Sequence, residues 1–131
     1  MKKTVSILRF AIAINALILI NACSSYAQNA VAPAAFEAKI VQPNVLLVDV
    51  RTPQEFASGH LENARNINYN DPKFKENIAL LDKSKPIAIY CGVGGRSGKT
   101  SKILVELGFK DITDLAGGIT AWTAARKKVV K

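Results

Sequence analysis

Two short apolar runs constrain the fold of this chain more than any other feature. Residues 45–50 and residues 86–90 carry apolar or β-branched side chains at nearly every position. A strand with one face in water alternates between apolar and polar residues, whereas a strand covered on both faces does not. These segments therefore predict two central strands of a sheet that is covered on both faces.

Helix-forming segments alternate with these strands. Thr52 fits the N-terminal cap of a short helix, because Pro53 follows it directly. Residues 71–81 repeat apolar side chains at helical spacing, and another helix is expected to begin at Ser97 or Ser101. Further strands at 64–67 and 111–115, and a last helix around Trp122, complete the series. The predicted fold class is α/β, with a central, largely parallel sheet flanked by helices on both faces.

Length and composition limit the chain to one globular domain. It has 131 residues, of which 49% are hydrophobic, so it is long and apolar enough for a single packed core. Its two cysteines are too few for a disulfide-dense scaffold or a four-cysteine zinc site. We expect a linker and the start of a first helix over residues 28–39, and the domain itself over residues 40–128.

The first residues have the pattern of a bacterial export signal. A basic start precedes an apolar run at residues 10–22, which is shorter than the roughly 20 residues a helix needs to cross a bilayer. Two processing sites compete. Removal of residues 1–22 would leave Cys23 as a lipidated N-terminus, and removal of residues 1–27 would leave no lipid. Both predict a periplasmic protein, which would touch the membrane only through a lipid at Cys23.

The formal net charge of +8 raises nucleic acid as a partner. Three of the basic residues lie in the export signal, however, and four more lie in a C-terminal tail that fits a solvated helix end. No aromatic residues alternate with them to stack on bases. No nucleic-acid partner is expected, and the chain is expected to be a monomer.

Cys91 begins a glycine-rich segment between a predicted strand and a predicted helix. Once Cys23 is removed or lipidated, Cys91 is the only free thiol of the chain. Ligands of open α/β sheets bind at the carboxyl ends of strands, and a helix N-terminus attracts anions. Glycines let successive backbone N–H groups turn inward, and Arg96 adds a cation. These features favour a thiolate that attacks an anionic substrate, and a structural turn with an inert cysteine is the alternative. The candidate anion-binding loop consists of Gly92, Val93, Gly94, Gly95 and Ser97.

The motif Cys-x-x-Gly-x-Arg-Ser at residues 91–97 resembles the active-site loop of rhodanese-like sulfurtransferases. Three more segments resemble motifs of the same family in the same order. They are Asp-Val-Arg-x-x-x-Glu-Phe at 49–56, Gly-His-Leu-x-x-Ala-x-Asn-Ile at 59–67 and Leu-x-Gly-Gly-x-x-x-Trp at 115–122. The resemblance spans nearly the whole chain after the export signal.

This resemblance implies an enzyme in which Cys91 is nucleophile and sulfur carrier. Cys91 would take a sulfane sulfur from a small anionic donor such as thiosulfate and pass it to a thiol, cyanide or protein acceptor. The loop N–H groups would stabilise the persulfide, and Arg96 would bind the donor or hold the loop. Asp49 and Arg51, at the end of the first strand, would support the site, or Arg51 would simply form a structural ion pair with Glu55. The family needs no cofactor or metal.

The length of the loop and its second residue refine this reading. Phosphatases and arsenate reductases with the same fold have five residues between the cysteine and the arginine, whereas this chain has four. The shorter loop favours sulfur transfer. Gly92 stands where many thiosulfate-using members have a basic residue, so a second hypothesis stays open. In it, the chain is a sulfur carrier or binding module without turnover, which delivers persulfide sulfur to a protein partner.

Overall fold

The computed structural model describes residues 29–131. The predicted export signal and Cys23 lie outside the described residues. Within residues 29–131, no helix is both long enough and apolar enough to cross a membrane.

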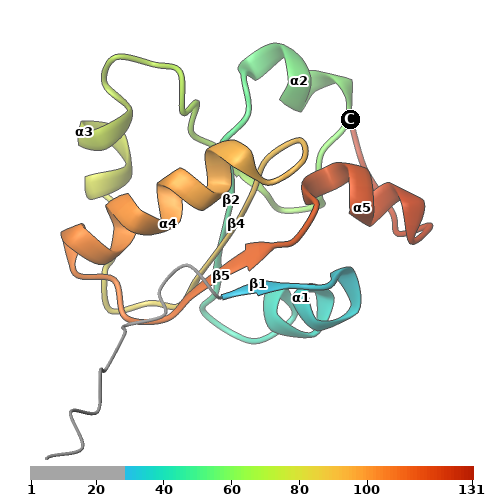
Figure 1. Ribbon diagram of the computed structural model, residues 1–131, viewed down its shortest axis with the longest axis horizontal. Coiled ribbons are helices and arrows are strands. Elements are labelled where there is room, and N and C mark those ends of the chain that lie inside the picture. Colours follow the sequence, from blue (N-terminus) through green and yellow to red (C-terminus); the bar gives the residue numbers. More distant parts are fainter. Residues whose placement is uncertain (1–28) are drawn as a thin grey trace, which may run out of the picture.

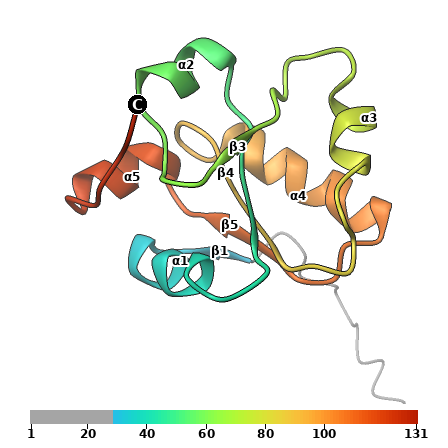
Figure 2. The same ribbon diagram turned by 180° about the vertical axis from the view of Figure 1, so that it is seen from behind.

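Five parallel strands form one sheet, in the order β1-β5-β4-β2-β3. They are β1 (Ala30–Val31), β2 (Leu46–Asp49), β3 (Arg65–Asn66), β4 (Ile87–Tyr90) and β5 (Ile112–Leu115). The helices are α1 (Pro33–Ile40), α2 (Pro53–Ser58), α3 (Phe74–Ala79), α4 (Gly95–Leu107) and α5 (Gly118–Ala124). Figures 1 and 2 show helices on both sides of the sheet, which confirms the predicted fold class.

The central strand β4 separates two apolar cores, and all four of its residues are buried. Because neighbouring side chains of a strand point to opposite faces, Ile87 and Ile89 enter one core while Ala88 and Tyr90 enter the other. The first core is closed by Leu104 of α4 together with residues of α3, and the second by residues of α1 and α5. Burial on both faces explains why these strands are apolar throughout.

The chain before α1 belongs to the sheet. We expected a linker before the first helix, but Ala30 and Val31 form β1 and pair with Asp114 and Leu115 of β5. A two-residue strand is too short to show a periodic pattern in the sequence, and its place depends on an edge that β5 provides.

The sequence predicted the start of α2 correctly and the start of α4 too late. Thr52 caps α2 as predicted. Its hydroxyl oxygen accepts a hydrogen bond from the Glu55 backbone N–H, and the Glu55 carboxylate accepts one from the Thr52 backbone N–H. Helix α4 begins at Gly95, earlier than the predicted Ser97 or Ser101. Its cap is Gly94, whose φ of 115° suits glycine. Arg96 and Ser97 therefore lie in the first turn of α4.

Candidate active site

Cys91 lies at the carboxyl end of the central strand, directly after β4. Three residues separate it from the first residue of α4, so the loop turns sharply from the sheet into the helix. In Figure 1 this loop lies between the start of α4 and α5. The position matches the ligand-binding edge of parallel α/β sheets.

Two groups of the predicted loop converge on the Cys91 sulfur. The backbone N–H of Gly94 donates a hydrogen bond to Sγ at 3.1 Å, and the Ser97 hydroxyl lies 3.4 Å from it. Cys91 is a free thiol and only 1% exposed. A hydrogen-bond donor at this distance can stabilise negative charge that develops on the sulfur during a reaction. Val93, in contrast, is 71% exposed at the tip of the loop.

Arg96 is held by a carboxylate that the sequence analysis did not assign to the site. Its guanidinium forms two hydrogen bonds with the carboxylate of Glu55, at 2.7 and 2.9 Å. These bonds lower the pKa of Glu55 to about 2. The same carboxylate belongs to the cap of α2, so it ties α2 to the first turn of α4. Of the two roles considered for Arg96, this contact supports holding the loop, and donor binding stays a prediction.

Asp49 and Arg51 form a buried ion pair near the strand ends. The Arg51 guanidinium lies 2.7 Å from the Asp49 carboxylate and also donates to the carbonyl of Gly59 at 2.7 Å. It lies over the ring of Tyr90, at 5.7 Å from the ring centre. Through these contacts the pair braces β2 and the end of α2 against β4. Glu55 was an alternative partner for Arg51, but it binds Arg96 instead.

The start of α5 holds the loop from behind. The backbone N–H groups of Ile119 and Thr120 donate to the carbonyls of Cys91 and Gly92, at 2.9 and 3.1 Å. Gly118 lies so close that a Cβ there would overlap both carbonyl groups. These two carbonyls therefore point toward α5. This contact gives a physical reason for the paired glycines of the 115–122 motif.

A buried acid lies on the opposite side of the loop, under the first turns of α4. Asp114 of β5 is 7% exposed, and its Oδ1 accepts no hydrogen bond from the described residues. Burial raises its pKa to about 6, while a hydrogen bond with the Ser97 side chain acts to lower it. The sequence analysis missed Asp114. The available clue was an acid inside a short, otherwise buried strand.

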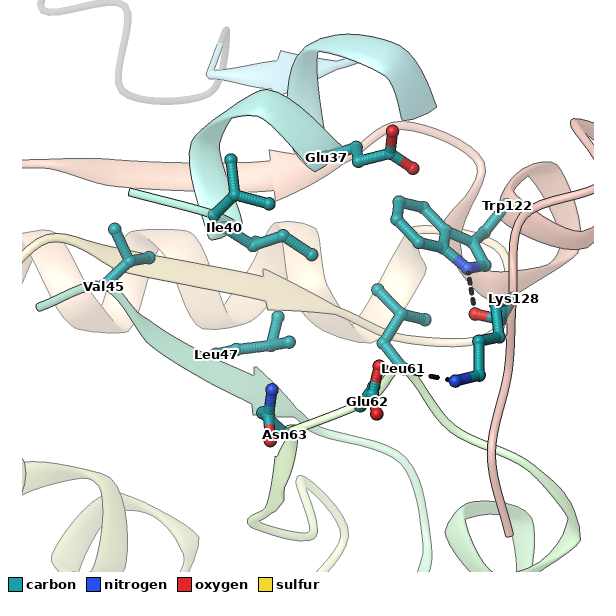
Figure 3. Close-up of a pocket in the computed structure, with 10 residues that line it drawn as sticks. Glu37, Ile40, Val45, Leu47, Leu61, Glu62, Asn63, Trp122 and Lys128 are labelled. Carbon is teal, nitrogen blue, oxygen red and sulfur yellow. Dashed lines mark hydrogen bonds and ion pairs between the residues drawn. The ribbon is translucent and has the colours of Figure 1, made fainter. Parts of the chain in front are cut away.

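A separate cavity of about 590 Å³ lies among α1, β2 and the C-terminal tail. Figure 3 shows Trp122 and Leu61 on its wall, with Glu37 and Glu62 beside it. No residue of the 91–97 loop lines this cavity. It is therefore distinct from the surroundings of Cys91.

Metal ligands do not cluster in the part of the chain that the structure describes: no group of three His, Cys, Asp or Glu residues could hold an ion there. The loop itself offers a buried sulfur, the Gly94 N–H and the Ser97 hydroxyl beside that sulfur, and an arginine whose charge is neutralised by Glu55.

Sequence comparisons place this chain among rhodanese-like proteins. The family model "Rhodanese-like domain" matches residues 32–125. Thiosulfate sulfurtransferase GlpE of Shewanella oneidensis is 35% identical over 89 residues, which cover 68% of this chain and 82% of that protein. GlpE of Coxiella burnetii is 33% identical over 81 residues, covering 62% and 74%. Protein YqhL of Bacillus subtilis is 40% identical over 76 residues, but the match spans only 59% of its length.

Solved structures agree with the sequence match. A rhodanese-related protein from Thermoplasma volcanium superposes with a TM-score of 0.69 at 30% identity, covering 77% of this chain and 96% of that protein. A rhodanese-like domain protein from Staphylococcus aureus has a TM-score of 0.63 at 30% identity, covering 71% and 89%. Together with the geometry of the Cys91 loop, these matches show that the chain belongs to the rhodanese-like domain family, which includes sulfurtransferases.

Proposed function

We propose that this protein is an exported sulfurtransferase that carries sulfane sulfur as a persulfide on Cys91. The observation that carries the proposal is the position of the Cys91 sulfur at the start of α4, where the Gly94 N–H reaches it at 3.1 Å. Relatives with thiosulfate sulfurtransferase in their names support the reaction class. The short spacing of four residues between Cys91 and Arg96 favours it over phosphate or arsenate chemistry.

The reaction proceeds in two balanced displacements. The Cys91 thiolate attacks the outer sulfur of the donor, a bond forms between the two sulfurs, and the donor's own sulfur bond breaks. With thiosulfate the electron pair leaves with sulfite. An acceptor nucleophile then attacks the outer sulfur of the persulfide and restores the Cys91 thiolate. Cyanide leaves as thiocyanate, and a thiol leaves as a new persulfide. Donors near Sγ stabilise the anion in both steps.

The second hypothesis is a sulfur carrier that delivers to a protein partner without rapid turnover of small donors. Its support is the ion pair between Arg96 and Glu55, which neutralises the loop's arginine. Gly92 adds no charge where a basic residue would help to bind thiosulfate. Under this hypothesis a protein donor loads Cys91, and the exposed Val93 at the loop tip is available for contact with that protein.

Intact mass spectrometry after incubation with sulfur donors tests the proposal. The parent should gain one sulfur atom, and Cys91→Ser should gain none, because a serine hydroxyl cannot carry a sulfane sulfur. Ser84→Ala, which alters an exposed turn, is the matched control and should load like the parent. Multiple turnover with thiosulfate and cyanide supports the enzyme, whereas loading without turnover supports the carrier. A parent that gains no sulfur from any donor contradicts both.

Export is a separate part of the proposal and rests on the N-terminal pattern alone. Mass spectrometry of the mature N-terminus should show cleavage after residue 22 or after residue 27. Acyl chains on Cys23 would select the lipid-anchored form. A product that retains Met1 in the cytoplasm would contradict export without affecting the proposed chemistry.

A further inference from the structure

Glu55 and Arg96 form a close pair of opposite charges beside the active-site loop. The two Nη atoms of the guanidinium donate to the two carboxylate oxygens, at 2.7 and 2.9 Å. The pair borders Gly92, the residue directly after Cys91, because a Cβ at Gly92 would lie 3.3 Å from Nη2 of Arg96 and 3.9 Å from Oε2 of Glu55. Both side chains are partly open to solvent. A sulfur donor that approaches Cys91 past Gly92 therefore meets both charges.

The carboxylate of Glu55 is also held by its own helix. Its Oε1 accepts hydrogen bonds from the Thr52 hydroxyl and backbone N–H, at 3.1 and 3.4 Å. The cap of α2 thus keeps the carboxylate beside the loop even when Arg96 turns toward a donor. The pKa of Glu55 is lowered to about 2 by Arg96, so the carboxylate is charged at neutral pH. The negative charge is therefore a fixed part of the surroundings of Cys91.

The pairing leaves Arg96 only part of its capacity for an anion. The fork between its two Nη atoms, which can hold a planar anion with two bonds, faces Glu55. A donor must use another edge of the same guanidinium, which keeps it within a few ångströms of the Glu55 carboxylate. Attraction by Arg96 and repulsion by Glu55 then largely cancel. A second negative charge on the donor gains little here, whereas the cost of taking it out of water rises steeply with charge.

We propose that Glu55 is a specificity-determining residue, which offsets the attraction of Arg96 and so makes the site select sulfane donors with one negative charge over doubly charged thiosulfate. Organic thiosulfonates belong to the favoured class. The inference rests on the proposed function, because it takes Cys91 as the atom that receives the sulfur, and it adds the charge of the donor.

The test compares thiosulfate, with two negative charges, and methanethiosulfonate, with one. With either donor, the Cys91 thiolate forms a bond to the outer sulfur and the donor's own sulfur–sulfur bond breaks. The electron pair leaves with sulfite in the first case and with methanesulfinate in the second. The persulfide is followed by mass on the Cys91 peptide, so that Cys23 does not interfere. Low donor concentrations and constant ionic strength give a second-order rate constant for each donor.

Glu55→Gln keeps the size of the side chain and an oxygen for the cap of α2, and it removes the charge. This variant should form the persulfide about tenfold faster with thiosulfate and about threefold faster with methanethiosulfonate, because the electrostatic energy is proportional to the charge of the donor. A tenfold change corresponds to a charge about 8 Å from the donor at an effective dielectric constant of about 60. The ratio of the thiosulfate rate to the methanethiosulfonate rate should therefore rise about threefold.

This ratio separates charge selection from a structural role, since a change that only loosens the loop alters both rates by the same factor. Glu106→Gln removes the same charge from an exposed position near the other end of α4 and should leave the ratio unchanged. Glu55→Asp keeps the charge and should also keep the ratio, even where both rates fall. A ratio in Glu55→Gln that equals that of the parent, or that falls below it, overturns the proposal.

A second pair of variants tests the same balance of charges with Glu55 in place. The atoms nearest to a Cβ at Gly92 are the flexible ends of Arg96 and Glu55, so a side chain fits there after a small shift. Gly92→Lys adds a positive charge beside the pair, and its ratio should be about threefold higher than that of Gly92→Gln, which adds a neutral side chain. Equal ratios in these two proteins overturn the proposal, whether or not Glu55→Gln folds.

The two donors also separate this proposal from the proposed function. A parent that forms no persulfide with either donor contradicts both. A parent that forms the persulfide, together with variants that all keep its ratio, contradicts only the role given to Glu55.

Discussion

Replacing Gly118 with alanine tests how α5 holds the active-site loop. Gly118 has a φ of 58°, in the left-handed region, and an added Cβ would lie 2.5 Å from the carbonyl oxygen of Gly92 and closer still to that of Cys91. Those are backbone atoms, so no side chain can move aside. The loop and α5 must separate, which weakens the hydrogen bonds from Ile119 and Thr120.

The expected loss of stability follows from these contacts. The left-handed conformation costs an alanine roughly 1–2 kcal/mol. The two hydrogen bonds contribute roughly 0.5–1.5 kcal/mol each. Gly118→Ala should therefore lower the free energy of unfolding by roughly 2–5 kcal/mol, out of the roughly 5–15 kcal/mol typical of a domain. The protein should stay folded at room temperature, with a melting temperature lower by about 10 °C or more.

Thermal unfolding followed by circular dichroism measures this change, and intact mass after sulfur loading measures its effect on the site. Gly98→Ala is the matched control, because Gly98 is inside α4 and a Cβ there meets nothing within 4 Å. That control should be stabilised by roughly 0.5–1 kcal/mol. A Gly118→Ala protein that melts with or above the parent would refute the proposed contact between α5 and the loop.

Three more predictions follow from the charged groups. Arg96 lowers the pKa of its partner Glu55 to about 2, so their ion pair should stabilise the protein above pH 4.5 and be lost toward pH 2. Urea unfolding of Glu55→Gln should show a free energy of unfolding lower by about 1 kcal/mol at pH 7, and that free energy should depend less on pH in acid than it does in the parent. Burial raises the pKa of Asp114 from 3.8 to about 6, so the parent should lose up to about 3 kcal/mol of stability as the pH rises from 4 to 7. Asp114→Asn should show no such loss. The same change of unfolding free energy with pH in both proteins would contradict this prediction. Asp49→Asn leaves Arg51 buried without its charged partner, so unfolding should become easier by roughly 3 kcal/mol, while the alkylation rate of Cys91 in the folded protein should stay unchanged.

Much of the fold could be predicted from local patterns. Nearly continuous apolar residues at 45–50 and 86–90 indicated central strands, because strands covered on both faces carry that pattern. The cap of α2 followed from Thr52 and its neighbours, since capping depends on residues within one turn. The start of α4 was placed too late, because Gly94 caps it through its backbone conformation and not through a side chain.

The candidate site likewise contains one part that is local in the sequence and another that only the fold brings together. Cys91, the glycines and Arg96 are close in sequence, so their place between a strand and a helix was visible in the chain itself. The contact between Arg96 and Glu55 joins residues 41 positions apart, and no spacing rule predicts it. Asp114 lies near Ser97 only because the strand order places β5 beside β4, under α4.

The sequence by itself thus determined which segments are strands and helices and which thiol stands at the start of a helix. Periodicity, capping and glycine content act over a few residues, and a single chain displays them directly. Only the tertiary structure decided which charged and polar groups surround that thiol. Those groups come from β5, α2 and α5, and they lie around the 91–97 loop because burying the apolar faces of the sheet selects one order of the strands.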